Sequence, residues 1–578
     1  MFKKLLALLV PSFVVFSLNQ FSFAATPPAS QQMSGQERAR QMQEEEEYLQ
    51  NLVEQPKSKA KPEEKPAQEA APEGPAVQKV LVKNINVTGA SLFSKDKIKA
   101  ITSRYENKEL TLKEIQKIAD LITDLYRKKG FVTSRAYIPP QKMEQGVLEI
   151  KVLEATVGDI QIKGNLYHST HLLKSYLTVQ KGDFFNYNDI KRDLENINDQ
   201  PDINVKAVLV PGQEAGTTDI IMEVKDTLPM HVSFGYNNYL SNTLRRNIYS
   251  SGFTDNNLLG HDDVLTFQYE NGNFNDYYSY STHYLYSVTK SLDLGVYASR
   301  SKEVLGGAFA AVDSRGKSRM YGASGSQELI RNDNLNSHFN FGFDYMDVYN
   351  FLNGSISSQD RLRVARAGFD FDLSDGLGRT LVSDDYNYGI PGIMGGTGEH
   401  LSATDTPTSR AGAGGEFFKD TLNLMRLQVL PFDSTLLWKN QLQFSPRSLT
   451  STEQFQVGGP ANNRGYPVSE AVGDEGFTMS WELSEPPYSL PKYWNIPFTN
   501  AKIYDAIRII EFYDWSNVHL NSLQPGDEKN KTLSSAGCGV KINILKNLSA
   551  SYEIAWPLTG RSSDGRGVQQ WIEVTLTF

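Results

Sequence analysis

The 578-residue sequence lacks several features on which secreted and membrane proteins often depend. It has one cysteine, Cys538, which excludes an intramolecular disulfide framework and a cysteine-rich metal site. The formal net charge is −9 and no basic patch stands out, so nucleic acid is not expected as a partner. The mean hydropathy is negative, and no long apolar run follows Ala24. A helical membrane protein is therefore excluded.

Motifs for catalysis are equally scarce. The sequence contains no Gly-x-x-x-x-Gly-Lys loop for nucleotides. The nearest approach to a nucleophile elbow, residues 322–326, is misspaced and lies in an expected strand. His168 and His171 have helical spacing, but Ser169 and Thr170 stand between them and no glutamate completes a metalloprotease pattern. We therefore predict no enzyme, no cofactor and no metal site.

The N-terminus has the pattern of a secretory signal. Two lysines precede an apolar stretch over residues 5–16, and small residues follow up to Ala24. We predict a signal peptide over residues 1–24 with cleavage between Ala24 and Ala25. An uncleaved membrane anchor is the alternative, although the apolar stretch is short for a bilayer.

Residues 25–79 are rich in Gln, Glu, Lys, Pro and Ala and nearly devoid of aromatic side chains. Such a segment cannot bury enough surface to offset chain entropy, so no packed domain is expected. Residues 35–53 lack proline and favour one mostly polar helix, whereas residues 54–75 are typical of an extended, charged linker. A plain spacer without function is the alternative.

Residues 80–226 contain two successive units of the same plan: a strand, two helices and two strands. In the first unit Ser94 is expected to cap a helix. The next helix ends at Gly130 and carries apolar residues at i, i+3, i+4 spacing: Ile115, Ile118, Ala119, Ile122 and Leu125. We predict α+β domains at 80–154 and 155–227. Each leaves a strand edge that can accept an extended peptide; mere spacers are the alternative.

The region from residue 228 to 578 alternates apolar and polar residues in many short segments separated by turn residues. The aromatic and apolar faces of three such segments are Leu265, Phe267, Tyr269; Phe339, Phe341, Phe343, Tyr345; and Ala367, Phe369, Phe371, Leu373. No helix is long enough to cover this face, so lipid would. At about ten residues per strand the region fits a transmembrane β-barrel of sixteen antiparallel strands with moderate loops, and the same arithmetic allows more or fewer strands. A soluble β-sandwich would need far fewer residues.

Several motifs together resemble those of TpsB transporters of the ShlB/FhaC/HecB type, a branch of the outer-membrane assembly-factor superfamily. In the repeats, residues 126–132 and 139–141 resemble the first POTRA domain, and 211–212 and 216–219 the second. The barrel supplies an early turn signature over 257–263 and then, in order and spacing, Phe455, Gly458, Gly459, Arg464, Gly465, Tyr466, Gly473, Asp474, Gly476 and Glu482. Two positions depart from the family pattern: Asn463 replaces a common valine and Ser516 a usual glycine.

The resemblance implies that a loop around residues 455–476 folds back into the barrel, with Arg464, Gly465 and Tyr466 at its tip. Arg464 would pair with Asp514 on an inner wall strand, near Glu482. Independently, Asp514 stands among Phe512, Tyr513 and Trp515, which suits a lumenal wall, and an arginine fork suits a carboxylate. The Coulomb attraction of such a pair is about 4 kcal/mol before the cost of desolvation is subtracted. That is enough to favour one position of a mobile loop, but too little to stabilise a whole barrel. An ordinary surface salt bridge is the alternative.

The resemblance also implies the function. Two periplasmic POTRA domains would bind a large, unfolded exoprotein, and a pore in the outer membrane of a Gram-negative bacterium would export it without nucleotide hydrolysis. The expected partners are an adhesin, a haemolysin or a haem-binding protein, together with outer-membrane lipids and the machinery that inserts barrels. The helix over residues 35–53 resembles the family's plug. An assembly factor for other barrels is the alternative, although such factors usually carry more POTRA units; a simple porin leaves the repeats unexplained.

Overall fold

The computed structural model describes residues 79–578, apart from 144, 242, 243, 245, 273–275, 333, 400–405, 498, 500, 525, 545 and 546 and the side chains of 307–309. The predicted signal peptide with its cleavage site, the polar helix and the linker lie outside the described residues. The described chain forms two compact units, which meet in sequence between Pro229 and Met230.

The first repeat is a small α+β domain. Its elements are β1 (Lys79–Val82), β2 (Asn84–Thr88), α3 (Lys95–Thr102), β3 (Lys108–Thr111), α4 (Leu112–Arg127), β4 (Arg135–Tyr137) and β5 (Val147–Leu153). The sheet order is β2-β5-β4, and β1 pairs with β3 outside it, a pairing that alternation did not predict. The predicted apolar face of α4 is buried in the core, and a capping box of Thr111 and Glu114 begins the helix. Ser94 precedes α3, but its side chain makes no capping hydrogen bond.

The second repeat has the same plan. Its elements are β6 (Thr156–Lys163), α5 (Thr170–Ser175), α6 (Tyr187–Asn198), β7 (Ile203–Pro211) and β8 (Thr217–Asp226), in the sheet order β6-β8-β7. The Asp226 carboxylate accepts backbone N–H groups of Leu166, Tyr167 and His168 at 2.9, 2.8 and 2.8 Å, and His168 Nδ1 lies 3.3 Å from it. The Asp226 carboxylate, together with the buried His168 side chain, thus holds the turn after β6 against the end of β8.

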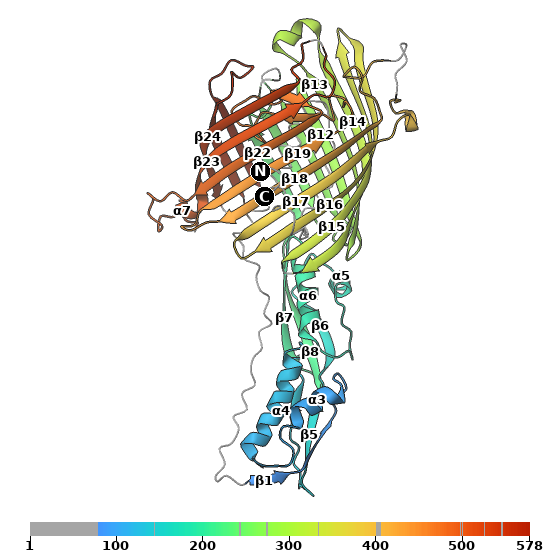
Figure 1. Ribbon diagram of the computed structural model, residues 1–578, viewed down its shortest axis with the longest axis vertical. Helices are drawn as coiled ribbons and strands as arrows, with labels where there is room; N and C mark the ends of the chain where they lie inside the picture. The colour runs from blue at the N-terminus through green and yellow to red at the C-terminus, as the bar shows by residue number, and fades with distance from the viewer. Residues whose placement is uncertain are drawn as a thin grey trace, which may run out of the picture. The chain divides into compact units, whose positions relative to one another are not determined.

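The third part of the chain closes into a barrel of sixteen antiparallel strands, which confirms the predicted fold class and strand number (Figure 1). The strands are β9 (Met230–Asn237), β10 (Ile248–Asp255), β11 (Val264–Gly272), β12 (Tyr277–Thr289), β13 (Leu292–Val304), β14 (Arg315–Asn332), β15 (Leu335–Leu352), β16 (Ser355–Asp375), β17 (Gly378–Gly389), β18 (Phe417–Val429), β19 (Thr435–Phe444), β22 (Glu475–Glu485), β23 (Ile507–His519), β24 (Asn530–Ile544), β25 (Leu548–Pro557) and β26 (Gln569–Thr577). β26 pairs with β9, so no edge remains.

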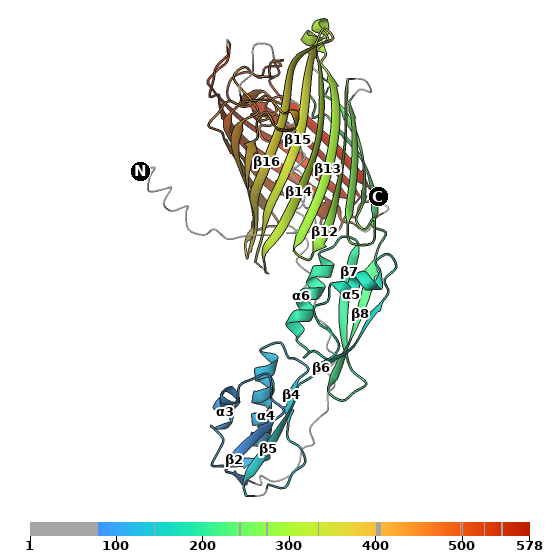
Figure 2. The same cartoon turned by 90° about the vertical axis from the view of Figure 1, so that its right-hand side faces the viewer.

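The two ends of the barrel differ. The proximal end holds Met230, where the chain enters β9, and Phe578, whose backbone pairs with Val232. Most connections there are short, apart from residues 486–506, which include α7 (Ile503–Ala506), whereas the distal end carries the two longest connections, 390–416 and 445–474, and the 3-10 helices η3 (Gly307–Val312) and η4 (Ile393–Gly395). The longest strands, β14 to β16, run side by side in Figure 2.

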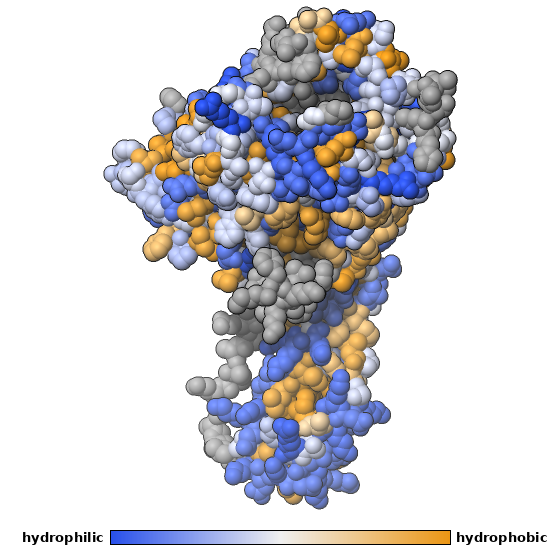
Figure 3. Space-filling model, turned by 45° about the horizontal axis from the view of Figure 1, so that its top comes forward, coloured by the Kyte–Doolittle hydropathy of each residue, from blue (hydrophilic) through white to orange (hydrophobic). Residues whose placement is uncertain are grey.

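Alternation places apolar side chains outside and polar ones in the lumen. Phe267, Phe341 and Phe369 on the outer face are 43%, 41% and 36% exposed, whereas the lumenal Asp344 and Arg366 pair with each other behind the wall. Hydrophilic residues gather over the distal end in Figure 3, with hydrophobic residues on the wall beneath. The wall therefore presents an apolar surface to lipid and a polar one to the lumen. Among the described helices, none is long and apolar enough to cross a membrane.

Candidate functional site: a loop seated in the barrel lumen

Residues 445–474 connect β19 to β22 from the distal end, and most of this loop is buried. The loop contains a small hairpin of β20 (Phe455–Val457) and β21 (Ala471–Gly473). Phe455, Val457 and Tyr466 are each 0% exposed and pack with Val518 and Leu533 of the barrel wall. The loop thus occupies the lumen and does not project from the rim.

Two glycines give the loop its tight fold. Gly459 has φ +93°, a left-handed conformation that side chains disfavour, and its N–H donates to the Tyr466 carbonyl at 2.9 Å. Gly465 lies against the wall so closely that a Cβ there would stand 2.4 Å from Cβ of Ser535. A glycine at the tip is therefore required for the contact that its neighbours make with the wall.

Arg464 is the centre of the tip. Its Nε and Nη2 donate to the two oxygens of Asp514 at 3.0 and 2.9 Å, and its backbone N–H donates to the same carboxylate at 3.0 Å. Nη1 donates to Glu482 at 2.6 Å and lies 3.6 Å from Glu553. The guanidinium also stacks on Phe512, with Cζ 3.3 Å from the ring centroid. One arginine, 3% exposed, thus joins β22, β23 and β25.

Neighbouring groups complete the seat. Trp571 Nε1 on β26 donates to the Arg464 carbonyl at 2.7 Å, and the Gly465 N–H donates to Ser535 on β24 at 3.1 Å. The Tyr466 hydroxyl donates to the carbonyl of Thr559 and accepts the Thr559 N–H at 3.1 Å. The tip is therefore bound to five consecutive wall strands.

The two residues that depart from the family pattern contact each other. Asn463 Nδ2 donates to Ser516 Oγ at 3.1 Å, and both residues are 0% exposed. A valine and a glycine could not form this hydrogen bond. The two departures therefore add one polar contact to the same seat.

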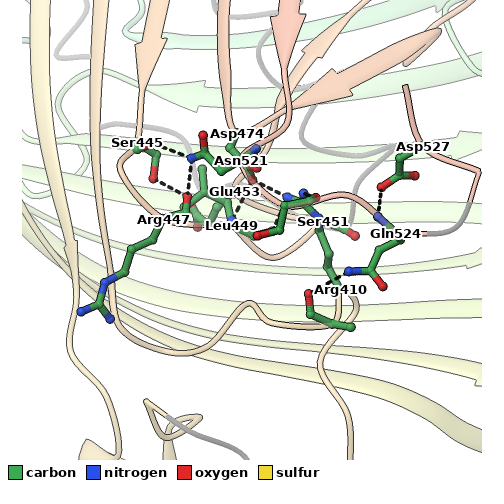
Figure 4. A network of polar contacts seen from close by, with 12 residues as sticks. Arg410, Ser445, Arg447, Leu449, Ser451, Glu453, Asp474, Asn521, Gln524 and Asp527 are labelled. Carbon is green, nitrogen blue, oxygen red and sulfur yellow. Dashed lines mark hydrogen bonds and ion pairs between the residues drawn. The ribbon is translucent and has the colours of Figure 1, made fainter. Parts of the chain in front are cut away.

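A second polar network fastens the root of the loop (Figure 4). The fully buried Asp474 accepts the guanidinium of Arg410 and the backbone N–H groups of Leu449 and Asn521, both at 2.8 Å. Arg410 Nη2 also donates to the Ser522 carbonyl at 2.6 Å. Asp474 thus ties the inward loop to two other distal connections, the one before β18 and the one before β24.

The strands that receive the tip are regularly paired with each other. β22 and β23 pair without a register shift through the segment that receives it, with Ser480 opposite Asp514 and Glu482 opposite Phe512. The tip contacts these strands by side chains and loop backbone alone. The ladder between β22 and β23 therefore includes no hydrogen bond from the tip.

The structure brings together all six lumenal residues named from the sequence: Arg464, Gly465, Tyr466, Asp514, Glu482 and Phe512. Sequence reasoning missed Trp571, Ser535 and the Arg410–Asp474 contact. Trp571, Ser535 and Arg410 lie far from the loop tip in sequence and outside the motif; Asp474 belongs to the motif, but its partner Arg410 does not. No group of three or more His, Cys, Asp or Glu that could hold a metal ion is found in the described part of the chain.

Three comparisons place these features among known proteins. The model of the haemolysin secretion/activation protein family ShlB/FhaC/HecB matches residues 216–504, that of the ShlB-type POTRA domain matches 80–155, and a second POTRA model matches 155–225.

Two relatives and one solved structure match this chain over most of its length. The heme/hemopexin transporter protein HuxB of Haemophilus influenzae is 23% identical over 491 residues, 84% of each chain. The outer membrane transporter CdiB of Dickeya dadantii is 22% identical over 568 residues, 95% of this chain and 94% of its own. The structure of CdiB from Escherichia coli superimposes with a TM-score of 0.68 at 20% identity, covering 96% of this chain and 100% of CdiB. The chain belongs to the haemolysin secretion/activation family ShlB/FhaC/HecB, the outer-membrane transporters of two-partner secretion, which export an exoprotein through a barrel preceded by periplasmic POTRA domains.

Proposed function

We propose that the exoprotein is captured as an extended strand on the free edge of β7, and that it crosses the lumen after the tip of loop 445–474 leaves its seat. In this proposal residues 1–24 are a signal peptide and residues 25–79 are a plug helix with its linker. Residues 80–154 and 155–227 are the two POTRA domains, and residues 228–578 are the barrel. The observation that supports it is a loop buried in the lumen, whose tip is held by Arg464 through side-chain contacts that form no part of the β22–β23 ladder.

The β7 edge suits strand addition better than its counterpart in the first domain. Asn198 on α6 hydrogen-bonds the N–H and C=O of Val205, which point away from β8. Because the direction of these groups alternates along a strand, the N–H and C=O of Ala207 and Leu209 also point away from β8. Among the described residues no hydrogen-bond partner is found for the N–H and C=O groups of Ala207 and Leu209 on this edge. In the first domain β4 spans three residues, and Thr123 on α4 accepts the Ala136 N–H at 3.0 Å.

No step of this proposal requires a cofactor or a catalytic residue. Two events contribute free energy: strand addition in the periplasm and folding of the exoprotein outside the cell. The partner that fits is a large secreted protein of the adhesin, haemolysin or haem-binding type, the last being the closest in kind to the heme/hemopexin transport named for HuxB. Outer-membrane lipids and the machinery that inserts barrels complete the partners of the transporter.

Substituting Leu209→Pro is expected to lower export of the exoprotein by at least about tenfold. Proline removes the outward N–H that an added strand would use, while the neighbouring residues keep their pairing with β8. The measurement is the amount of exoprotein in the medium, normalised to the amount of assembled transporter.

The matched control is Leu209→Ala, which trims the side chain and keeps the N–H. Export close to the wild-type amount is expected for this variant. If alanine and proline lower export equally, the side chain of Leu209 matters and the backbone edge does not, which contradicts strand addition at β7.

A further inference from the structure

Four cations face outward from two adjacent strands near the distal end of the barrel. Arg300 and Lys302 on β13 lie directly opposite Arg319 and Lys317 on β14. Directly opposed residues of an antiparallel pair point to the same side of the sheet. The lumenal side of β13 is taken by Tyr297, Ser301 and Glu303, all buried, so the four cations lie on the outer wall.

Two like-charge pairs in direct opposition are unfavourable unless something neutralises them. Arg319 is paired with Asp347 on β15 at 3.0 Å. For Arg300, Lys302 and Lys317, no ion pair is found with any acidic residue that the structure describes; the Lys317 ammonium lies over the ring of Phe351, 4.9 Å from its centroid. The wall therefore carries an excess of positive charge that an external anion would stabilise.

The position of this cluster relative to the apolar wall indicates the anion. Outward residues on β13 run from Leu294 and Val296, 42% and 57% exposed, to Arg300 and Lys302 at the distal side. At about 3.4 Å per residue, Lys302 lies roughly 27 Å along the strand from Leu294, which is roughly 20 Å across the membrane for a strand tilted by about 40°, toward the distal edge of an apolar belt about 25 Å tall.

Aromatic side chains mark the boundary. Tyr280 on β12 lies opposite Arg300, and Tyr321 on β14 follows Arg319 on the outer face. The Tyr321 ring lies 6.3 Å from that of Tyr345 on β15. Rings of this kind occupy the level of the headgroups in membrane barrels. Because the POTRA domains are periplasmic, the distal end faces the outer leaflet.

We propose that Arg300, Lys302, Lys317 and Arg319 form a binding site for the phosphorylated headgroup of lipopolysaccharide in the outer leaflet. Phosphate oxygens would bridge the opposed cations of β13 and β14, with Arg supplying paired N–H groups and Lys single charges. The acyl chains of the same lipid would lie along Leu294, Val296 and Tyr321. The site binds a lipid to the outside of the wall and takes no part in the lumen.

The test uses the full-length transporter in detergent, titrated with fluorescently labelled lipopolysaccharide. The variant is Arg300→Gln, Lys302→Gln and Lys317→Gln together, which leaves the Arg319–Asp347 pair intact. A loss of affinity of roughly tenfold to hundredfold is expected, as for the removal of three cations from a membrane surface. The matched control, Lys97→Gln, Lys99→Gln and Lys113→Gln on the exposed surface of the first POTRA domain, should bind like the wild type.

Two further arms identify the ligand. Dephosphorylated lipopolysaccharide should bind the wild type about as weakly as the intact lipid binds the triple variant. Inorganic phosphate should not compete at millimolar concentration, because it lacks the acyl chains. Equal binding by the triple variant and the wild type, equal binding of the dephosphorylated lipid, or full competition by inorganic phosphate would each overturn the proposal.

Assembly of the variant barrel is checked by its heat-modifiable migration. If the triple variant does not assemble, the double variant Lys302→Arg with Lys317→Arg replaces it. That variant keeps the charges and adds paired donors, so affinity at or above the wild-type value is expected, and a clear loss of affinity would contradict the site.

Discussion

Export is expected to fall by at least about tenfold when Arg464 is replaced by alanine, because two buried carboxylates of the wall lose their partner and the barrel becomes less stable, so that it melts at a lower temperature. The substitution leaves Asp514 and Glu482 buried without their shared guanidinium. Removing one partner of a buried ion pair typically costs about 3–5 kcal/mol. The measurements are exoprotein in the medium and the thermal midpoint of the folded barrel.

The loop offers a matched control. Arg447 lies in the same connection, but its side chain is 50% exposed and pairs with Glu416 at 2.6 Å at the rim. Exposed pairs contribute at most about 1 kcal/mol, so Arg447→Ala should change neither export nor the thermal midpoint appreciably. Arg464→Lys keeps the charge but cannot span both carboxylates, and an intermediate result is expected. Wild-type export and stability for Arg464→Ala would show that the tip contact is dispensable.

Replacing Asp474 with alanine is expected to release the root of the loop. The variant leaves the buried guanidinium of Arg410 without its carboxylate and leaves the N–H groups of Leu449 and Asn521 without an acceptor. Each buried unsatisfied group costs about 1–3 kcal/mol, and more for a charged one. We expect protease added outside the cells to cleave loop 445–474 at least about tenfold faster, with lowered export.

Two variants bracket this result. Asp474→Asn keeps the shape and one acceptor oxygen and should show a smaller effect. Asp527→Asn removes an exposed carboxylate that, among the described residues, accepts one hydrogen bond, from the Gln524 N–H at 2.9 Å, and should behave like the wild type. Unchanged protease resistance for Asp474→Ala would contradict the role of this network at the root.

The elements with a strong period were predictable from the sequence. The apolar positions of α4 repeat at helical spacing and lie in the core of the first domain, because that spacing places them on one face. Phe341 and Phe369 alternate with polar residues and lie on the outer wall, because successive side chains of a strand point to opposite faces of the sheet. The length of the region was compatible with sixteen strands but did not determine that number, because loop lengths vary between strands.

Contacts between distant loops have no periodic signal. Arg410, Asp474 and Asn521 come from three different connections between strands, and only the closed barrel brings them together. The pairing of β1 with β3 was missed because each has four residues, too few for alternation to distinguish. Ser94 occupies the predicted cap position without the predicted bond, since a sequence gives the residue type and not its rotamer.

Arg464 illustrates what a motif adds to physical reasoning. The aromatic residues around Asp514 indicated a lumenal wall, and an arginine fork indicated a carboxylate partner, but neither identifies which arginine pairs with it. The family spacing supplied that choice. The stacking on Phe512 and the bond from Trp571 depend on how five strands converge on the tip, which no local pattern contains.

The most direct test is secretion of the large protein encoded beside this gene. It would be coexpressed with the wild-type transporter, with a transporter lacking residues 80–226, and without the transporter. The account predicts exoprotein in the medium or at the cell surface with the wild type alone, while the shortened barrel still inserts in the outer membrane. Exoprotein that leaves the cell equally well without the gene, with other outer-membrane barrels depleted instead, would contradict the account and favour an assembly factor.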